Sequence, residues 1–314
     1  MSKLTFDDFV GNEGAVQKAR LLIDEAVNNT HGRIPDMAFL GAAGHGKNTL
    51  AEAIASETKR KLLVINSTVI RDPFQFRGLV MDLSTNNEQG SIIVIDECHA
   101  LNRRIQDNLL TATEHPRELH TSHKEQVFTD KLPENLSLIF ATTHAASIGP
   151  ALMSRLEPIE FLPYSTAEQL EMAVKYMERR HKVSGAKLDA KCMIQVAQRA
   201  RNGRQVARFC DTIVRYMNKN KINKLDDKAI QECFDVLGVD KNGLTRVDRI
   251  MLGHLQKMNT HVGLDTLDAV MPVTKKEIKD CIEPYLLKKN FIIRTSSGRM
   301  ITTKGRLALK TENS

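Results

Sequence analysis

Apolar runs with the length of strands alternate with helix-like segments through the first half of the chain. The runs are nearly continuous in aliphatic and aromatic residues, which is typical of strands buried on both faces of a parallel sheet. The segments between them are long enough for the crossover helices of βαβ units. We predict strands at Met37–Leu40, Lys61–Ile65, Ser91–Asp96, Leu136–Thr142 and Pro158–Leu162. This half is therefore expected to be an α/β unit around a parallel sheet.

From Thr166 to about Leu237 the strand signals vanish. Segments such as AEQLEMAVKYMERR (167–180) and VARFCDTIVRYMNK (206–219) carry apolar residues three or four positions apart. This spacing places the apolar residues on one face of a helix. We therefore predict that a second, all-helical domain follows the α/β unit.

The remaining chain starts at the turn-like VDKNG (239–243) and changes pattern again. Helical periodicity predicts helices at Arg246–Met258, Leu264–Met271 and Lys275–Lys289. The segment FIIRTSSGRMITT (291–303) then predicts a strand pair, with Ser297 and Gly298 in the turn. Three helices followed by a hairpin form a winged helix, a variant of the helix-turn-helix. The predicted division is an α/β domain at 1–163, a helical lid at 164–238 and a winged helix at 239–314.

Composition is that of a soluble globular protein. The 314 residues are 41% hydrophobic and 26% charged, and no run reaches the length of a membrane span. The N-terminal MSKLTFDDF lacks the apolar stretch of a signal segment. Five scattered cysteines form no CxxC pair, which favours reduced thiols over a disulfide framework. These features predict a cytoplasmic protein with no membrane partner.

Positive charge is concentrated in the last quarter of the chain. Residues 239–314 contain 14 Lys or Arg and 8 Asp or Glu, a net charge of +6 out of +7 for the whole chain. Such asymmetry indicates an anionic partner, and nucleic acid is the usual one. A lysine-rich solvated surface would give the same count, so charge alone does not separate the two interpretations.

The most specific motif is GAAGHGKNT (41–49), which lies between the strand Met37–Leu40 and a helical stretch. A strand, a glycine-rich loop and a helix in this order form a phosphate-binding P-loop. Gly41, Gly44 and Gly46 let the backbone point its N–H groups inward, and Lys47 can reach the outer phosphates. The motif therefore predicts nucleotide binding.

The segment SIIVIDE (91–97) ends a predicted buried strand with two carboxylates. Ligands of open parallel sheets bind at the carboxyl ends of the strands. At that edge Asp96 would hold Mg²⁺, and Glu97 would polarise the attacking water. Two acids at a strand end are often only solvated, but the glycine loop upstream favours the catalytic interpretation.

Three further residues carry weaker signals. LSLIFATT (136–143) is another buried strand with a polar end, so Thr143, or with less support Thr142, would orient water or sense a phosphate. Arg155 in ALMSRLEP could stabilise transition-state charge in a neighbouring subunit. Arg204 opens a helix of the lid and could close over the phosphates. Each arginine taken alone is more often an ordinary surface residue.

The order of these motifs resembles that of AAA+ ATPases, and more narrowly that of the RuvB family of Holliday-junction branch-migration motors. The likeness runs from FDDFVGNE (6–13) almost to the C-terminus. Its most specific segments are IDECHALNR (95–103), VGLDTL (262–267), EPYLLKKNFIIRT (283–295) and SGR (297–299). The winged-helix match matters most, because generic AAA+ proteins lack that domain.

The resemblance implies a hexameric ring that binds ATP and Mg²⁺ between subunits and drives branch migration of four-way DNA junctions. Within this scheme Lys47 and Thr49 contact phosphates, and the two acids of the SIIVIDE strand serve metal and water. Thr143 is the first sensor, Arg204 is the second, and Arg155 acts on the adjacent subunit.

The resemblance also assigns residues to the base and to DNA. Tyr164 would stack on adenine, although it sits one place closer to Arg155 than in the family pattern. Arg294 and Arg299 match paired DNA-contacting arginines and would both project from the hairpin of the wing. Contacts to the phosphate backbone carry no base information, which suits a motor that must not stall at preferred sequences.

Asn48 departs from the P-loop pattern, in which a Ser or Thr hydroxyl binds Mg²⁺. The amide oxygen can ligate Mg²⁺, but the side chain is longer and lacks the hydroxyl hydrogen. We expect a working ATPase whose turnover rises in the Asn48→Thr variant. Two alternatives remain: a clamp-loader-like switch, which the winged helix argues against, and a DNA-binding regulator that uses ATP only to assemble.

Two other departures concern partners. The stretch PRELHTSHKEQVFTDKL (116–132) occupies the place of the hairpin that grips RuvA through an apolar tip. Here it is mainly polar, with Val127 and Phe128 as larger apolar residues, so a RuvA-like partner is uncertain. The segment before the first helix is also short for the family. The departures together suggest a divergent copy, such as one carried by a phage.

Overall fold

The first half of the chain is built around a five-stranded parallel sheet with the strand order β2-β3-β6-β1-β7. Its strands are β1 (Met37–Leu40), β2 (Lys61–Asn66), β3 (Ser91–Asp96), β6 (Leu136–Thr142) and β7 (Glu157–Glu160). The predicted bounds of β1, β3 and β6 are confirmed, β2 is one residue longer, and β7 starts one residue earlier and ends two residues earlier than predicted. The α/β prediction for this half of the chain is therefore confirmed.

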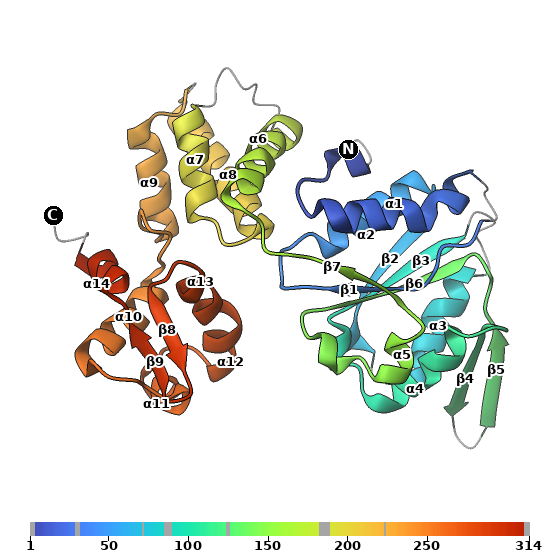
Figure 1. Cartoon of the computed structure of the whole chain (residues 1–314). Helices are drawn as coiled ribbons and strands as arrows, with labels where there is room; N and C mark the ends of the chain where they lie inside the picture. The colour runs from blue at the N-terminus through green and yellow to red at the C-terminus, as the bar shows by residue number, and fades with distance from the viewer. Residues whose placement is uncertain are drawn as a thin grey trace. The chain divides into compact units, whose positions relative to one another are not determined.

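Helices cover both faces of the sheet (Figure 1). The helices α1 (Glu13–Asn28) and α2 (Lys47–Glu57) pack on one face, against the side chains of Ile92 and Val94. On the other face lie α3 (Pro73–Ser84), α4 (Arg103–Ala112) and α5 (Pro150–Met153). Alternate strand side chains thus enter two separate apolar cores, which explains why the strands are continuously apolar.

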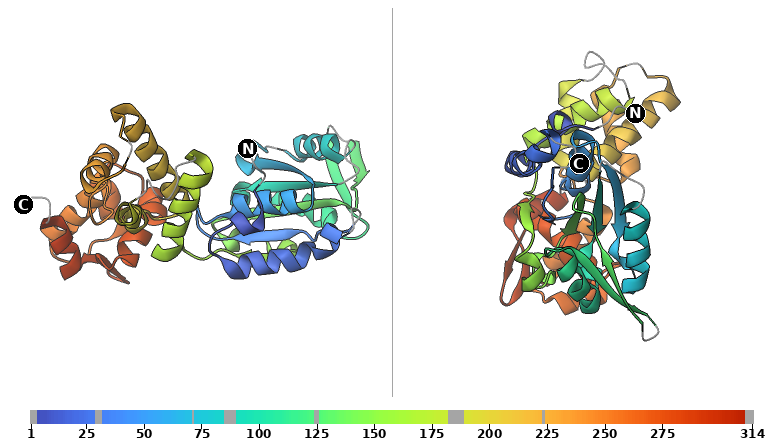
Figure 2. Two further views of the ribbon diagram at one scale, coloured as in Figure 1. Left: turned by 90° about the horizontal axis from the view of Figure 1, so that it is seen from above. Right: turned by 90° about the vertical axis from the view of Figure 1, so that its right-hand side faces the viewer.

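An antiparallel hairpin of β4 (Glu118–His123) and β5 (Gln126–Lys131) extends from this unit (Figure 2). It occupies the stretch where the sequence resemblance implied a hairpin. Its turn, residues 124–125, lies outside the described residues. Four 3₁₀ turns complete the unit: Phe6–Asp8, Ser67–Val69, Cys98–Ala100 and Ala145–Ser147.

The computed structural model describes residues 4–28, 32–70, 72–84, 90–123, 126–181, 189–222 and 224–310. It divides into two compact units: Met1–Glu168 with Asn202–Arg204, and Gln169–Arg201 with Gln205–Ser314. The three-domain division stays a prediction. Within the described residues, no helix is long and apolar enough to cross a membrane.

The lid is helical, as predicted. It comprises α6 (Thr166–His181), α7 (Ala190–Arg199), α8 (Gly203–Asn220) and α9 (Asp227–Leu237). One face of each of these helices is apolar, and together the four faces enclose a core that includes Val196, Phe209 and Phe234. The predicted all-helical character of this part of the chain is therefore confirmed.

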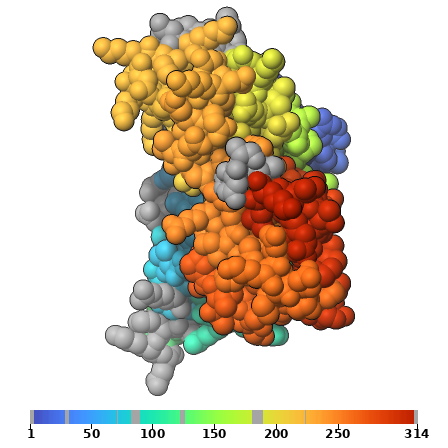
Figure 3. Space-filling model, turned by 90° about the vertical axis from the view of Figure 1, so that its left-hand side faces the viewer, coloured from blue at the N-terminus to red at the C-terminus, as the bar shows by residue number. Residues whose placement is uncertain are grey.

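The C-terminal segment is a winged helix with its own apolar core (Figure 3, orange to red). Its elements are α10 (Arg246–Met258), α11 (Leu264–Val270), α12 (Lys275–Glu277), a π-turn (Ile278–Ile282), α13 (Glu283–Lys288), β8 (Ile292–Thr295), β9 (Gly298–Ile301) and α14 (Thr303–Lys310). The prediction of one regular helix over Lys275–Lys289 differs from this. Pro284, the second residue of α13, has no N–H to donate to the preceding turn, and the π-helical segment ends two residues before it.

Candidate functional site

The glycine loop joins the carboxyl end of β1 to the start of α2. Gly44 and Gly46 adopt positive φ angles of 76° and 96°, which side chains other than glycine rarely adopt. A Cβ atom at Gly46 would also lie 2.5 Å from the hydroxyl oxygen of Tyr164. The loop therefore needs glycine at these positions, and α2 starts directly behind it with free N–H groups suited to phosphate.

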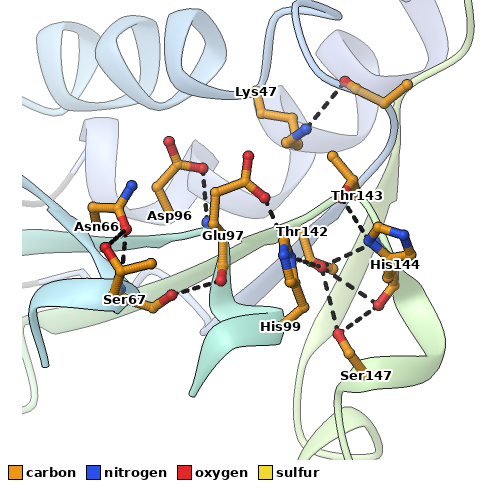
Figure 4. Close-up of polar contacts among 12 residues, drawn as sticks. Lys47, Asn66, Ser67, Asp96, Glu97, His99, Thr142, Thr143, His144 and Ser147 are labelled. Carbon is orange, nitrogen blue, oxygen red and sulfur yellow. Dashed lines mark hydrogen bonds and ion pairs between the residues drawn. The ribbon is translucent and has the colours of Figure 1, made fainter. Parts of the chain in front are cut away.

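Lys47 lies at the first position of α2 and is only 7% exposed. Its Nζ donates to the carbonyl oxygens of Gly41, at 2.6 Å, and Ala42, at 3.1 Å. Burial lowers the pKa of Lys47, and the carboxylates of Glu97 and Asp96 oppose that shift. Lys47 and the two acids thus form one electrostatic cluster at the carboxyl edge of the sheet (Figure 4).

Asn48 connects the glycine loop to the acidic strand. Its Nδ2 donates to Oδ2 of Asp96 at 3.0 Å. Its Oδ1 is buried and makes no hydrogen bond to any described residue. The side chain lacks the hydroxyl hydrogen of the usual residue, as the sequence indicates, and the amide nitrogen is the donor to Asp96 instead. The amide oxygen is left as a buried acceptor beside a carboxylate, which is the chemistry of an Mg²⁺ ligand.

Glu97 is held in an unusual backbone conformation at the end of β3. Its φ of 52° and ψ of 41° are in the left-handed region, which is uncommon for a residue with a side chain. Its carbonyl oxygen accepts a hydrogen bond of 2.5 Å from Ser67 Oγ. Its Oε2 lies 3.2 Å from Nδ1 of His99 (Figure 4). Both ends of the residue are therefore fixed by neighbours.

The two hydroxyls at the end of β6 differ in access. Thr142 is buried, and its Oγ1 accepts from the backbone N–H of His144 at 3.0 Å. Thr143 is partly exposed, and its Oγ1 lies 2.7 Å from Nδ1 of His144. The rings of His144 and His99 make an edge contact with centroids 5.1 Å apart. Of the two candidates, Thr143 is thus the one with an accessible hydroxyl.

The two histidines were not predicted from the sequence. His99 lies in IDECHALNR, two positions after Glu97, and His144 directly follows the ATT segment. Each lies within three residues of a predicted site residue, and that proximity is the only sequence signal for them. The His99 ring lies between the two strand ends, with Nδ1 3.2 Å from Glu97 Oε2 and 3.5 Å from Thr142 Oγ1, so it links the acidic strand to the sensor strand (Figure 4).

Tyr164 supports the glycine loop from behind. It is buried, its ring stacks on His45 with centroids 5.7 Å apart, and its hydroxyl donates to the His45 carbonyl at 2.9 Å. Burial raises the pKa of Tyr164 to about 12, so the phenol stays protonated as a donor. Its role in stacking on adenine stays a prediction.

Three other predicted residues make no hydrogen bond or ion pair with the acids of this cluster among the described residues. Thr49 is exposed in the first turn of α2. Arg204 is exposed, and its charge contributes to the lowered pKa of Lys47. Arg155 follows α5, where its Nε donates to Glu114 Oε1 at 2.9 Å. The predicted roles of these three residues are not tested by these positions.

In the wing, the sequence predicts that Arg294 and Arg299 both project from the hairpin. They are cross-strand partners of β8 and β9. The Arg294 side chain is 51% exposed, as expected. The Arg299 side chain is only 9% exposed because it forms an ion pair with the buried Glu283 of α13. For Arg299 the structure therefore differs from the prediction, since a carboxylate from a helix already occupies its guanidinium.

Comparison with known families gives matches over both units. Residues 37–164 match the ATPase family associated with various cellular activities (AAA). Residues 241–310 match the RuvB C-terminal winged helix domain. The predicted pairing of an AAA+ sheet with a winged helix is therefore confirmed.

Related proteins match over nearly the whole chain. The Holliday junction branch migration complex subunit RuvB of Prochlorococcus marinus (strain MIT 9215) is 28% identical over 99% of this chain and 87% of its own length. The protein of the same name from Thermotoga maritima is 27% identical over 98% of this chain and 91% of its own. The solved structure of the Thermotoga maritima RuvB Holliday junction branch migration motor superposes with a TM-score of 0.82 at 25% identity, covering 98% of this chain and 97% of that one. Over nearly its whole length the chain is therefore similar to RuvB proteins, and its C-terminal segment matches the winged helix domain of that family.

Proposed function

We propose that this protein is an ATP-driven DNA motor of the RuvB type, which promotes branch migration of Holliday junctions. The observation that carries the proposal is the cluster of Lys47, Asn48, Asp96 and Glu97 at one sheet edge, in a chain that also carries a basic winged helix. Phosphate-binding and water-activating groups that converge at a P-loop are suited to phosphoryl transfer. The place of action would be the cytoplasm.

The chain's own residues divide the work of ATP hydrolysis. The N–H groups of the glycine loop hold the phosphates, and Lys47 exchanges its two carbonyl partners for phosphate oxygens. Asn48 Oδ1 and Asp96 are placed to hold Mg²⁺, which would neutralise charge on the phosphoryl oxygens.

Glu97 would accept a proton from the attacking water, and Thr143 would orient that water from the neighbouring strand. His99 fixes the Glu97 carboxylate while this happens. Because the acid and the sensor come from adjacent parallel strands, their spacing is set by the sheet itself. The site is therefore organised before nucleotide arrives, which is how electrostatic stabilisation becomes effective.

Subunit assembly would complete the site. We infer a homo-oligomeric ring of six subunits, the number that the family resemblance implies. In this ring Arg155 acts on the nucleotide of the adjacent subunit, and Arg204 of the lid closes over the phosphates of its own subunit. Support comes from the chemistry of Arg155, whose exposed side chain is held, among the described residues, by Glu114 and by the backbone carbonyl of Ala151. A partner's phosphate could compete for that guanidinium.

Branched DNA is the proposed substrate, contacted mainly through its backbone. The test is migration of a synthetic four-way junction while ATP consumption is followed. We expect Mg²⁺-dependent turnover that DNA stimulates, and loss of both turnover and migration in the Glu97→Gln variant. Junction migration that proceeds without ATP, or with Glu97→Gln, would contradict the proposal.

A second candidate is an ATP-assembled DNA-binding regulator with weak or no hydrolysis. The specific observation behind it is Asn48 in place of the usual hydroxyl residue. The same assay separates the two functions: ATP-dependent oligomers without turnover, with or without branched DNA, would support the regulator. The contact of the Asn48 amide nitrogen with Asp96, together with the buried amide oxygen that accepts no hydrogen bond from the described residues, favours the motor.

A RuvA-like partner would bind this chain weakly or be replaced. Phe128 of the β4–β5 hairpin packs against Phe74, with ring centroids 5.6 Å apart, and under the Arg77 guanidinium. Val127, the other larger apolar residue of the hairpin, is 74% exposed and is therefore available for contact with a partner. A pull-down with a RuvA protein should recover little of this chain at physiological salt, and firm capture would contradict this.

A further inference from the structure

The wing hairpin contains an electrostatic conflict that a helix resolves. Arg294 and Arg299 face each other directly across β8 and β9. Like charges in opposite cross-strand positions repel and destabilise a hairpin. Glu283, at the start of α13, lies between the two, with Oε1 on Nε of Arg299 and Oε2 3.5 Å from Nη1 of Arg294. One carboxylate therefore offsets two guanidinium groups.

The two arginines are held to different degrees. Arg299 and Glu283 are both buried, and a buried ion pair resists separation because either charge alone would be left desolvated. The backbone of Arg299 is fixed as well, by two hydrogen bonds to Val262, of 2.8 and 2.9 Å. Arg294 instead has a half-exposed side chain, and its ion pair with Glu283 is the longer one, at 3.5 Å.

The ion pair with Arg299 uses only one of the two carboxylate oxygens of Glu283. Its Oε2 is buried and makes no hydrogen bond to any described residue, so its only described attraction is the 3.5 Å approach of Arg294. An unsatisfied carboxylate oxygen in a buried position costs free energy. It therefore draws Arg294 inward, in competition with any phosphate outside.

We propose that Glu283 is a positioning residue for DNA binding that competes with the DNA backbone for Arg294 while it keeps Arg299 inside the wing. Arg294 exchanges the carboxylate for a phosphate when DNA binds, and Arg299 does not. This inference rests on the proposed DNA-binding function of the wing. The consequence is a lowered affinity for DNA, which lets a translocating subunit release it.

The test measures binding of the full-length protein to fluorescently labelled duplex DNA over a range of salt concentrations. Glu283→Gln removes the competing charge and keeps the side-chain shape. We expect it to bind DNA about two- to five-fold more tightly than wild type, the range of a partly exposed ion pair. The matched control is Asp265→Asn, which changes net charge equally at an 89% exposed side chain that pairs with Lys275. Its effect should be smaller.

A double-mutant cycle tests whether Glu283 acts through Arg294. Arg294→Gln should weaken binding and reduce the slope of log K against log salt by about 0.9, as expected for one lost phosphate contact. In the Arg294→Gln background, Glu283→Gln should give no further gain beyond that of the Asp265→Asn control. A gain that persists without Arg294, or one no larger than the control, would overturn the proposal.

Glu283→Gln leaves Arg299 buried without its partner, so folding is checked by thermal unfolding of each variant. The double variant Glu283→Gln with Arg299→Met removes both buried charges. It replaces the single variant in the binding measurements if Glu283→Gln alone is unstable. We expect it to keep the wild-type salt slope and at least the wild-type affinity. A slope smaller by about 0.9 would show that Arg299 itself contacts phosphate and would refute the proposal. Wild-type protein that ignores DNA even at low salt would instead refute the DNA-binding function.

Discussion

The side-chain amide of Asn48 offers both a hydrogen-bond donor and an acceptor at the end of the glycine loop. Its nitrogen donates to Asp96, which orients the carboxylate, and its oxygen stays buried and available. A hydroxyl can also donate and accept, so the substitution of Asn for the usual residue keeps both functions and changes their reach. The residue-scale expectation is therefore retained hydrolysis at an altered rate.

Removing the amide tests this interpretation. Asn48→Ala deletes a hydrogen bond to a charged group and a candidate metal ligand, so Mg²⁺-dependent turnover should fall about 10- to 100-fold. Asn48→Thr should turn over faster than wild type, because a hydroxyl matches the usual geometry of the motif. Both are measured as ATPase rates over a magnesium titration. Unchanged turnover and magnesium dependence in Asn48→Ala would show that the amide has no part in the reaction.

His99 sets the orientation of Glu97, and its removal should affect rate more than binding. Without the 3.2 Å contact the carboxylate is free to rotate, and misplacement by about 1 Å can cost 100-fold in rate. We expect His99→Ala to lower kcat and to leave KM for ATP nearly unchanged, because Glu97 does not hold the phosphates. His99→Gln, which keeps a polar group, should recover part of the rate. A raised KM with normal kcat would contradict this role.

At the scale of elements, Arg117 ties the base of the β4–β5 hairpin to the parallel sheet. It is fully buried and donates to the carbonyl oxygens of Ala112 and Leu136 and to the carboxylate of Asp36. Asp36 in turn accepts from the backbone N–H of Leu138 at 2.7 Å. Burial raises the pKa of Asp36, and the Arg117 charge opposes that shift. One side chain thus joins α4, β4, β6 and the start of β1.

Substituting only one partner of the Arg117–Asp36 ion pair should destabilise the fold. Arg117→Met leaves Asp36 as a buried carboxylate without its hydrogen-bonded counter-ion and with only the weaker influence of the Arg33 charge, so the free energy of unfolding should fall by about 3–5 kcal/mol. The double variant Arg117→Met with Asp36→Asn removes the lone charge and should recover part of that loss. Urea unfolding monitored by circular dichroism measures both. Equal stability of Arg117→Met and wild type would show that the pair contributes nothing to the fold.

At the scale of the whole molecule, the lid and the winged helix form one compact unit. Arg201, between α7 and α8, pairs with the fully buried Asp248 of α10 and lies 4.1 Å over the ring of Tyr285. The Tyr285 hydroxyl donates to the carbonyl of Asn242 at 2.9 Å. Arg201 thus joins the lid helices to the winged helix within this unit.

This junction predicts an uncoupled variant. Arg201→Gln combined with Asp248→Asn removes the ion pair without leaving a lone buried charge. We expect ATP turnover without DNA to persist, while stimulation by branched DNA is lost, because the wing no longer moves with the lid. The measurement is ATPase rate with and without a four-way junction, on protein shown to unfold cooperatively. Normal stimulation in a folded double variant would exclude this route.

Local patterns predicted most of the architecture. The strands β1, β3 and β6 were recognisable because residues buried on both faces must all be apolar, and this requirement is visible in consecutive positions. The P-loop was equally clear, because neighbouring residues form it. The winged helix followed from helical spacing and a serine–glycine turn. Pro284, however, has an effect on helix geometry that periodicity does not reveal.

The layers, the phosphate loop, the acidic strand and the basic end of the chain could be predicted from local sequence, since each depends on residues close along the chain. The pairing of Asn48 with Asp96, 48 residues away, and the burial of Arg299 by Glu283 became visible in the folded chain alone. Such pairings depend on how strands and helices are placed in space. The charge of a side chain is readable from its identity, but its exposure and its partner are properties of the packed fold.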